Sequence, residues 1–320
     1  MAVCAGITIF ASLFFSNPIK SQEETIIYID DDDTHDSVWN KASLGWRGEM
    51  LSKVLPYKHV RTGRYVIAPN TGILTLYRKI RNGQQDPILL TIPSSRTMEK
   101  LAGTLSNKLM LDSTTLVNAF TDENFCAKMG YNTATLPALF IPNTYEVYWD
   151  ISLKGLMNRM QKENKAFWNT EREQKVKMLN MTHEEICTLA SIVDEETAND
   201  AEKPIIAGLY LNRLNQGMPL QADPTVKFAV GDFSLRRITG EHLKKESPYN
   251  TYINIGLPPG PIRIASIAGL DAVLNRQQHH YLYMCAKADF SGTHEYATTF
   301  NEHKKNARKY IKALNARNIH

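Results

Sequence analysis

The most informative pattern of hydrophobic and polar positions lies at residues 183–199. Apolar residues recur there at intervals of three and four, which predicts a helix with one buried face. These residues are Ile186, Leu189, Ala190 and Val193. Thr182 and Glu185 are three residues apart and form a capping box, which predicts where the helix begins. We expect the rest of the chain to be organised around this helix.

Three consecutive acidic residues follow Val193, and at about 100° per residue their side chains point in three directions. Glu195 falls opposite the apolar stripe and should be solvated, whereas Asp194 and Glu196 fall on its two flanks. A carboxyl group that shares an apolar face loses hydration, which raises its pKa toward the range of a general acid. An acidic run is more often a solvated face or a cap. The pattern alone therefore leaves both interpretations of Glu196 open.

The chain before residue 95 predicts a small module of mixed strands and a helix at 23–94. Short apolar runs bounded by turn residues predict strands at 25–30, 64–67 and 87–92. A helix is predicted at 73–80, and the four acidic residues at 30–33 are typical of a solvated loop.

Helical periodicity dominates the chain after residue 95. It predicts helices at 97–109, 113–119, 153–176 and 298–316, and a buried strand at 281–284. Another helix follows the acidic residues, with Asp200 as its cap and Gly217 at its end. Residues 219–261 have little regular period and much Pro, Gly, Asn and Tyr. A long irregular stretch inside a compact domain is usually functional.

Residues 2–15 are almost wholly apolar, and a polar stretch follows them. The run has no basic residue before it, which is atypical of a signal peptide, and it is shorter than the ~20 residues of a spanning helix. Three interpretations stay open: the tail of a membrane anchor, a short signal-like region, or a buried helix. The position at the terminus favours membrane association.

Composition excludes several classes of function. The chain has 320 residues, 43% hydrophobic and 22% charged, which is typical of a globular protein. A net charge of +4 without a basic, aromatic-rich patch gives no support to nucleic-acid binding. The cysteines are too scattered for a zinc site or a disulfide framework. They are Cys4, Cys126, Cys187 and Cys285.

The irregular stretch and the helix before it hold polar and aromatic residues suited to carbohydrate. Amide, carboxylate and hydroxyl groups pair with sugar hydroxyl and acetamido groups, and tyrosines offer flat faces to sugar rings. The candidate substrate-binding residues are Asn212, Gln221, Asp223, Thr225, Tyr249, Asn250 and Tyr252. Taken singly, each also fits a turn or a brace, and Arg213 fits an ion pair with Asp223. A desolvated carboxyl beside them indicates cleavage of a glycosidic bond.

Four motifs in order carry a resemblance to a known family. Residues 190–197 read Ala-Ser-Ile-Val-Asp-Glu-Glu-Thr, and 220–226 read Leu-Gln-Ala-Asp-Pro-Thr-Val. Residues 249–252 read Tyr-Asn-Thr-Tyr, and 256–260 read Gly-Leu-Pro-Pro-Gly. In these motifs the chain resembles the YceG-like (MltG) family of endolytic murein transglycosylases.

The resemblance implies an α+β fold in three parts. Residues 1–22 would be a hydrophobic N-terminal anchor and residues 23–94 a small LysM-like α+β module. Residues 95–320 would form a larger mixed α/β catalytic domain. The chain would be a single-pass protein of the cell inner (plasma) membrane. Its catalytic domain would lie on the periplasmic or outer side.

The resemblance also implies a reaction and partners. Glu196 matches the family's catalytic glutamate, and Asp194 stands where the family has another glutamate. One carboxyl would act as acid and then as base, cleaving the β-1,4 bond between N-acetylmuramic acid and N-acetylglucosamine within strands and leaving 1,6-anhydro ends. No metal or cofactor is implied. Peptidoglycan strands are the expected partner, with peptidoglycan synthases as further candidates and no nucleic acid.

Two other functions stay open from the residues. A hydrolytic muramidase would need a second carboxylate, for which Asp194 and Asp223 are the candidates. A non-catalytic peptidoglycan-binding scaffold would need only the N-terminal module and the irregular loops.

Overall fold

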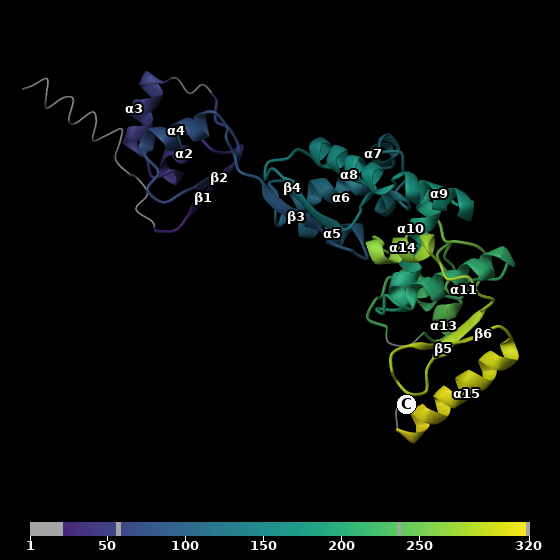
Figure 1. The fold of residues 1–320 in the computed structure, drawn as a ribbon. Coiled ribbons are helices and arrows are strands. Elements are labelled where there is room, and N and C mark those ends of the chain that lie inside the picture. Colours follow the sequence, from purple (N-terminus) through teal and green to yellow (C-terminus); the bar gives the residue numbers. More distant parts are fainter. Residues whose placement is uncertain (1–21, 56–58, 236–237, 318–320) are drawn as a thin grey trace, which may run out of the picture. The chain divides into compact units, whose positions relative to one another are not determined.

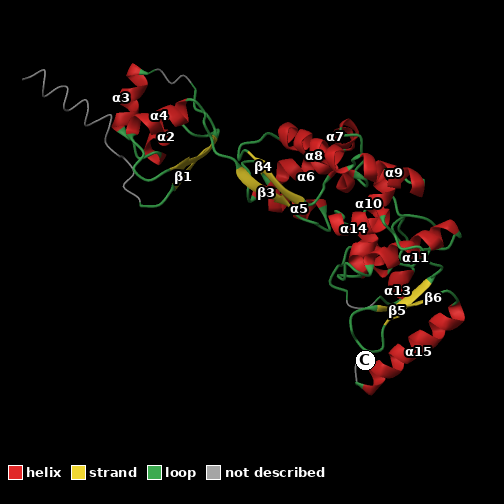
Figure 2. Ribbon diagram, in the orientation of Figure 1, coloured by secondary structure: helices red, strands yellow, loops and turns green. Residues whose placement is uncertain are grey.

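The structure is a computed structural model that describes residues 22–55, 59–235 and 238–317. Its fold is mixed α+β, as predicted, and helices predominate (Figure 2). In the described part, three sheets of two strands each are formed by β1 with β2, β3 with β4, and β5 with β6. The strands are β1 (Thr25–Ile29), β2 (Gly63–Ile67), β3 (Ile88–Ile92), β4 (Asn143–Val147), β5 (Tyr283–Ala286) and β6 (His294–Ala297).

The helices agree with most of the predicted ranges. Those before the central helix are α2 (His35–Lys41), α3 (Trp46–Val54), α4 (Ile73–Arg81), α5 (Met98–Ser106), α6 (Ser113–Thr121), α7 (Glu123–Lys128), the 3-10 turn η1 (Leu136–Leu139), α8 (Leu153–Phe167) and α9 (Thr170–Leu179). The others are α10 (His183–Glu196), α11 (Lys203–Asn215), α12 (Asp223–Val230), α13 (Gly240–Leu243), α14 (Ile267–Leu274) and α15 (Phe300–Ala316).

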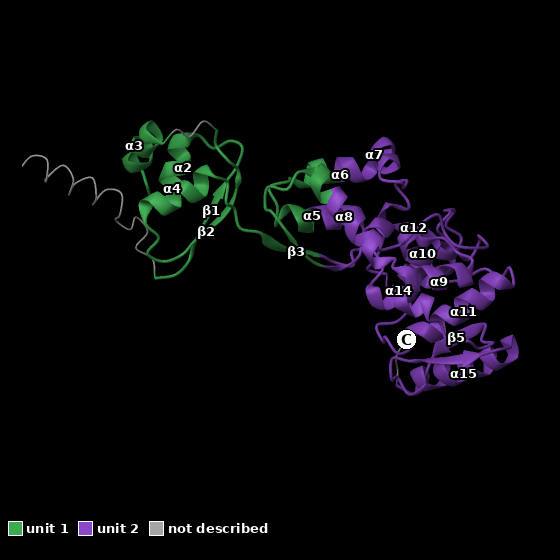
Figure 3. Cartoon of the chain, turned by 45° about the horizontal axis from the view of Figure 1, so that its top comes forward, with its two compact units in different colours: residues 1–91, 103–116, 144–156 green, residues 92–102, 117–143, 157–320 purple. Residues whose placement is uncertain are grey.

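The chain divides into two compact units (Figure 3). One consists of the described parts of residues 1–91, 103–116 and 144–156, and the other of residues 92–102, 117–143 and 157–320. We call them unit 1 and unit 2 and describe each by itself.

Unit 1 begins with a hairpin-like pair of strands joined by two helices. β1 and β2 are antiparallel, with Thr25 opposite Ile67 and Ile29 opposite Gly63. The sequence pattern missed α2 and α3, because the acidic run before them resembles a loop. A capping box formed by Thr34 and Ser37 begins α2. Residues 27–80 supply one buried cluster, in which the Trp39 ring stacks on Tyr77.

The predicted capping box of α10 is confirmed. The Thr182 hydroxyl accepts a hydrogen bond from the Glu185 backbone N–H at 3.2 Å, and the Glu185 carboxylate accepts one from the Thr182 N–H at 2.8 Å. The prediction of one buried face is too narrow, because residues 186–193 are all buried. A helix segment that is buried on every side lies in the core. In unit 2, α10 packs against α11 and α14, which are labelled beside it in Figure 1, and against α12.

Two predicted helix boundaries are wrong. The stretch 153–176 is two helices, because the Asn169 side chain accepts a hydrogen bond from the Arg172 N–H and caps α9. α10 ends at Glu196 rather than at residue 199, since Thr197 adopts an extended backbone. The Thr197 hydroxyl accepts a hydrogen bond from the Asn199 N–H, which stabilises the turn after α10.

Two predicted features of the surrounding chain also change. Asp200 does not cap α11, which begins at Lys203 after Glu202 without a side-chain cap. The stretch 219–261 is less irregular than expected, because α12 and α13 lie within it. Asp223 and Pro224 occupy the first turn of α12, a position that suits proline.

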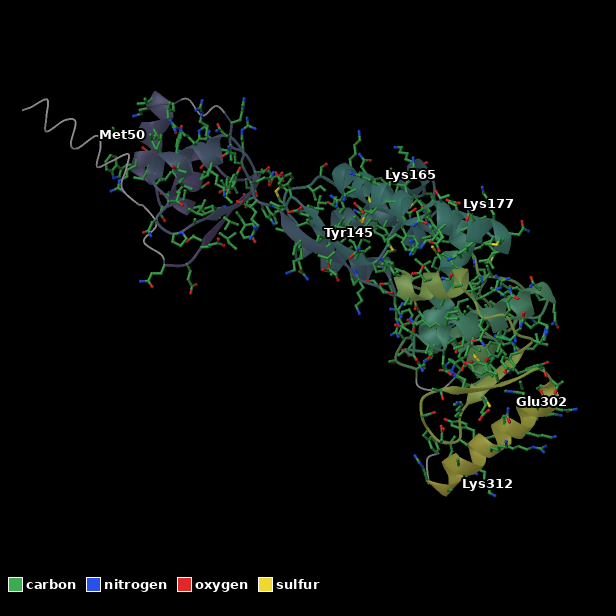
Figure 4. The ribbon with its side chains drawn as sticks, viewed as in Figure 1. Met50, Tyr145, Lys165, Lys177, Glu302 and Lys312 are labelled. Carbon is green, nitrogen blue, oxygen red and sulfur yellow. The ribbon has the colours of Figure 1, made fainter. Side chains whose placement is uncertain are left out.

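The last part of unit 2 is a β-hairpin covered by one long helix. β5 and β6 are antiparallel, and α15 packs on both strands. Lys312 is an exposed charged residue of α15, and the exposed Glu302 turns back to accept a hydrogen bond from the Thr298 hydroxyl before the helix starts (Figure 4). The predicted anchor at 1–22 lies outside the described residues except for Gln22. Within the described ranges, no helix is both long and apolar enough to cross a bilayer.

Candidate active site

Glu196 lies at the end of α10 and opens into a polar pocket of unit 2 with a volume of about 300 Å³. The pocket brings together residues from four stretches of the chain: α10, α11, residues 220–252 and the β5–β6 hairpin. Its polar lining residues are Glu196, Tyr210, Arg213, Gln221, Asp223, Tyr252 and His294. Four of the predicted site residues therefore share one cavity: Glu196, Gln221, Asp223 and Tyr252.

The Glu196 carboxyl has the environment of a proton donor. It accepts a hydrogen bond of 2.6 Å from the Tyr210 hydroxyl, which reaches it from α11. Burial raises the pKa of Glu196 to about 7, and the negative charge of Asp223 acts in the same direction. The Tyr210 hydrogen bond and the Lys227 charge oppose this rise. A carboxyl group with a pKa near neutrality can both give and take a proton.

Asp223 and Tyr252 form the opposite side of this pocket. The Tyr252 hydroxyl donates a hydrogen bond of 2.5 Å to Asp223 Oδ1, which joins the irregular loop to the first turn of α12. Gln221 lies beside them with a φ of 53°, in the left-handed region. Non-glycine residues in this region often occur at functional sites. Gln221 and Asp223 are exposed and Tyr252 is half-buried, and their polar atoms can bind hydroxyl and acetamido groups of a sugar.

Arg213 does not form the ion pair with Asp223 that its position allowed. It is buried, and its guanidinium donates hydrogen bonds to the carbonyl oxygens of Leu282 at 2.5 Å and Leu220 at 2.8 Å. It also donates to Gln221 Oε1 at 3.3 Å. Arg213 therefore ties the pocket loop to the hairpin strand, with one edge on the cavity.

Asp194 is turned away from the pocket. Its carboxylate accepts hydrogen bonds from the Ser266 N–H at 2.6 Å and the Ser266 hydroxyl at 2.7 Å. The Lys203 ammonium lies 2.8 Å from Asp194 Oδ1, and the Asp194 side chain is only 3% exposed. These bonds fix the end of α10 to the start of α14 and to α11. Asp194 is thus a positioning residue two places before Glu196.

The prediction that Glu195 is solvated is wrong. Arg96 forms a bidentate pair with the Glu195 carboxylate, at 2.7 and 2.8 Å, and Arg263 lies 2.8 Å from the same group. The Glu195 side chain is 12% exposed. A helical wheel describes only its own helix, whereas both arginines come from distant segments.

Three predicted substrate-binding residues are engaged inside the fold. Thr225 is buried, and its hydroxyl bonds to Ala222 and Thr251. Asn250 is also buried, and its amide donates to the carbonyl oxygens of residues 243 and 245. The Asn212 amide donates to the carbonyls of residues 279 and 281. Because their donors are satisfied internally, we give these three a role in shaping the loops. Tyr249 lines a different cavity.

Sequence reasoning missed Tyr210, the hydrogen-bond partner of Glu196. It lies among the buried residues of α11, a position that by itself indicates packing. A tyrosine on a buried face still needs a partner for its hydroxyl, and a neighbouring helix that ends in three acids supplies one. That argument could have found it, whereas nothing in the sequence marks His294 of the hairpin.

Comparison with known proteins identifies the fold. A model of the YceG-like family matches residues 33–309. The chain belongs to the YceG-like family. The solved crystal structure of a yceG-like protein from Listeria monocytogenes, at 2.6 Å resolution, is similar to it with a TM-score of 0.59 and 24% identity. The similarity covers 89% of this YceG-like chain and 99% of that one.

Relatives of this YceG-like chain have named activities. It is 37% identical over 166 residues to a Bacillus subtilis protein named endolytic murein transglycosylase, covering 52% of the chain and 45% of that relative. It is 26% identical over 308 residues to a Streptococcus pneumoniae protein of the same name, covering 85% and 55%. The chain thus spans about half the length of these curated relatives.

Proposed function

We propose that the chain is an endolytic murein transglycosylase and that Glu196 is its catalytic residue. It would cleave the β-1,4 bond between N-acetylmuramic acid and N-acetylglucosamine within a glycan strand. The observation that carries this proposal is a single partly buried carboxyl group with a pKa near 7 in a polar pocket. The names of two relatives support the same substrate class.

The steps follow from the two protonation states of Glu196. The protonated carboxyl gives its proton to the leaving glycosidic oxygen as the bond breaks, and the substrate's own N-acetyl group stabilises the cationic centre. The carboxylate then takes the proton of the C6 hydroxyl, whose oxygen attacks C1 and closes the 1,6-anhydro ring. The Tyr210 hydrogen bond stabilises the carboxylate between the two steps.

Asp223 supports a second candidate, hydrolysis by a muramidase. A hydrolase needs a second carboxylate near its acid, and Asp223 lines the same pocket as Glu196. Asp194 no longer fits that role, because its oxygens are bound by Ser266 and Lys203. Asp223 also accepts the Tyr252 hydrogen bond, which equally suits a group that only orients substrate.

We further propose the placement that the sequence suggests. The apolar segment would hold the chain at the plasma membrane with its catalytic part on the outer side, where peptidoglycan lies, and synthases would be neighbours there. The small module at residues 23–94 would bind glycan as a LysM-like unit.

Mass spectrometry of digested peptidoglycan strands tests the proposed reaction. The wild-type chain should release fragments with 1,6-anhydro ends, and Glu196→Gln should release none. Products one water heavier would establish hydrolysis instead, and Asp223→Asn should then abolish them. If neither protein releases products while both retain the strands, the chain is a binding scaffold.

A further inference from the structure

Unit 2 has a second pocket, of about 350 Å³, that shares no lining residue with the Glu196 pocket. We call it the aromatic pocket. It is formed by residues 95–99, by loops after α6 and α7, and by the far end of α12. Its lining includes Ser95, Arg96, Glu99, Phe228, Phe233 and Tyr249.

Aromatic rings make one wall of this pocket. The Phe228 ring lies 4.6 Å from that of Tyr249 and 6.2 Å from that of Phe233, measured between centroids. The Arg96 guanidinium lies 5.4 Å from the Phe233 centroid. Such a wall binds apolar side chains, and a guanidinium beside it binds a carbonyl or carboxylate.

Ser95 supplies a polar group without a protein partner. The residue is only 4% exposed, and its Oγ makes no hydrogen bond with the part of the chain that the structure describes. A buried hydroxyl in this state destabilises the fold. A ligand that bonds to Ser95 Oγ would remove this cost, which is a reason for a serine to occupy the site.

The charges at the rim are of both signs. Arg96 and Arg263 share the Glu195 carboxylate, and Arg96 remains 45% exposed at the pocket. Glu99 is exposed on the same rim. A short peptide carries carboxylate and amino groups that suit both. On a strand whose muramoyl carboxyl groups are amide-linked to peptide, the sugar rings carry no charge, so the rim favours the peptide over another sugar of the same strand.

α12 lies between the two sites. Its first residue, Asp223, lines the Glu196 pocket, and Phe228 lines the aromatic pocket. Five residues of helix correspond to about 7.5 Å, a distance that two or three extended peptide residues span. A short peptide on a strand held at Glu196 is therefore long enough to span this rise of α12.

We propose that the aromatic pocket binds the short peptide attached to a muramoyl residue of the strand, with an apolar side chain on Phe228 and Phe233 and a peptide carbonyl bonded to Ser95 Oγ. This proposal rests on the proposed function, because it places the peptide relative to a strand at Glu196. It makes the chain selective for strands that still carry peptides.

Calorimetric titration of the full chain with the free peptide, released from peptidoglycan by an amidase, tests the proposal without requiring cleavage. Wild type should bind the peptide. Ser95→Ala should weaken binding about threefold to tenfold through one lost hydrogen bond, and Phe233→Ala about tenfold through lost ring contact. Ser113→Ala, at an exposed serine on α6, is the matched control and should bind like wild type.

Thermal unfolding separates a ligand role of Ser95 from a structural one. Ser95→Ala should unfold at the same or a higher temperature than wild type, because it removes an unsatisfied hydroxyl. Weaker peptide binding with undiminished stability supports the proposal. No peptide binding by wild type at millimolar concentration, or equal binding by Ser95→Ala and wild type, would overturn it.

Digestion of strands stripped of peptide reports separately on the proposed function. Cleavage of stripped strands without peptide binding would leave the proposed activity standing and refute the peptide site. Peptide binding without cleavage of either stripped or peptide-bearing strands would support the peptide site and refute the proposed activity.

Discussion

At the scale of single residues, the pKa of Glu196 decides the pH range of the proposed reaction. The first step needs a proton on Glu196, so the rate should fall about tenfold per pH unit above pH 7. Tyr210→Phe removes a hydrogen bond that lowers this pKa and should move the fall to higher pH. Asp223→Asn removes a charge that raises the pKa and should move the fall to lower pH. The rate of product formation, measured from pH 5 to 9, checks the shift of each variant. Shifts of the same sign in the two variants would refute the assignment of Glu196 as the acid.

The same residue should limit stability. The pKa of Glu196 is about 7 in the folded chain against an ordinary value of 4.5. Ionisation of Glu196 therefore destabilises the fold. The free energy of unfolding is highest below pH 4.5 and falls as the pH rises through 7, by at most about 3 kcal/mol. Glu196→Gln should raise the unfolding temperature at pH 8 and leave it unchanged at pH 4. Equal effects at the two pH values would contradict a raised pKa.

Single residues also mark the limit of sequence reasoning about the site. The flanking position of the Glu196 side chain was predictable from helical spacing, whereas its desolvation was one of two interpretations that the pattern left open. The partners of Glu195, Thr225 and Asn250 were not, because arginines and carbonyl groups from distant segments satisfy them. Polar residue types indicate that bonds form, but tertiary structure decides whether the partner is substrate or protein.

At the scale of elements, the contact of α10 with α14 should be needed to place Glu196. A Cβ added at Gly269 would lie 2.6 Å from Asp194 Oδ1, which is closer than a Cβ atom approaches a non-bonded neighbour. Gly269→Ala should therefore displace the Asp194 carboxylate, cost about 1–3 kcal/mol in stability and lower the cleavage rate. Denaturant unfolding and product release measure the two effects.

Gly103→Ala is the matched control for this substitution. Gly103 lies within α5, and a Cβ there meets nothing within 4 Å. Alanine should stabilise that helix by about 0.5–1 kcal/mol, because it restricts the unfolded chain. If Gly269→Ala and Gly103→Ala change the stability and the cleavage rate alike, close packing at Gly269 does not position Asp194.

Element boundaries were predictable where local capping decides them. The capping box of Thr182 was read correctly, as was the last helix, which Thr299 caps one residue after its predicted start. Asn169 is an equally clear cap that the charged periodicity around it concealed. The helices α2 and α3 were missed because the acidic run before them resembles a loop and because their few apolar residues gain stability by packing into a tertiary cluster, as Trp39 does on Tyr77 of α4.

At the scale of the whole molecule, two of the hydrophobic clusters among the described residues are built from separate stretches of chain. One uses residues 27–80 and the other residues 138–274. Each unit therefore has a core of its own, and destabilisation of one core should leave the other unchanged. We expect thermal unfolding to show two transitions.

Trp39→Ala and Leu189→Ala form a matched pair for this expectation. Both side chains are at most 1% exposed, Trp39 in the first cluster and Leu189 in the second. Trp39→Ala should lower the free energy of unfolding of the first transition by about 3–5 kcal/mol and leave the pH dependence of cleavage unchanged. Leu189→Ala should lower the free energy of unfolding of the other transition by about 2–5 kcal/mol. Calorimetry with a cleavage assay distinguishes them. A single transition that both variants lower would mean that the two cores unfold as one cooperative unit.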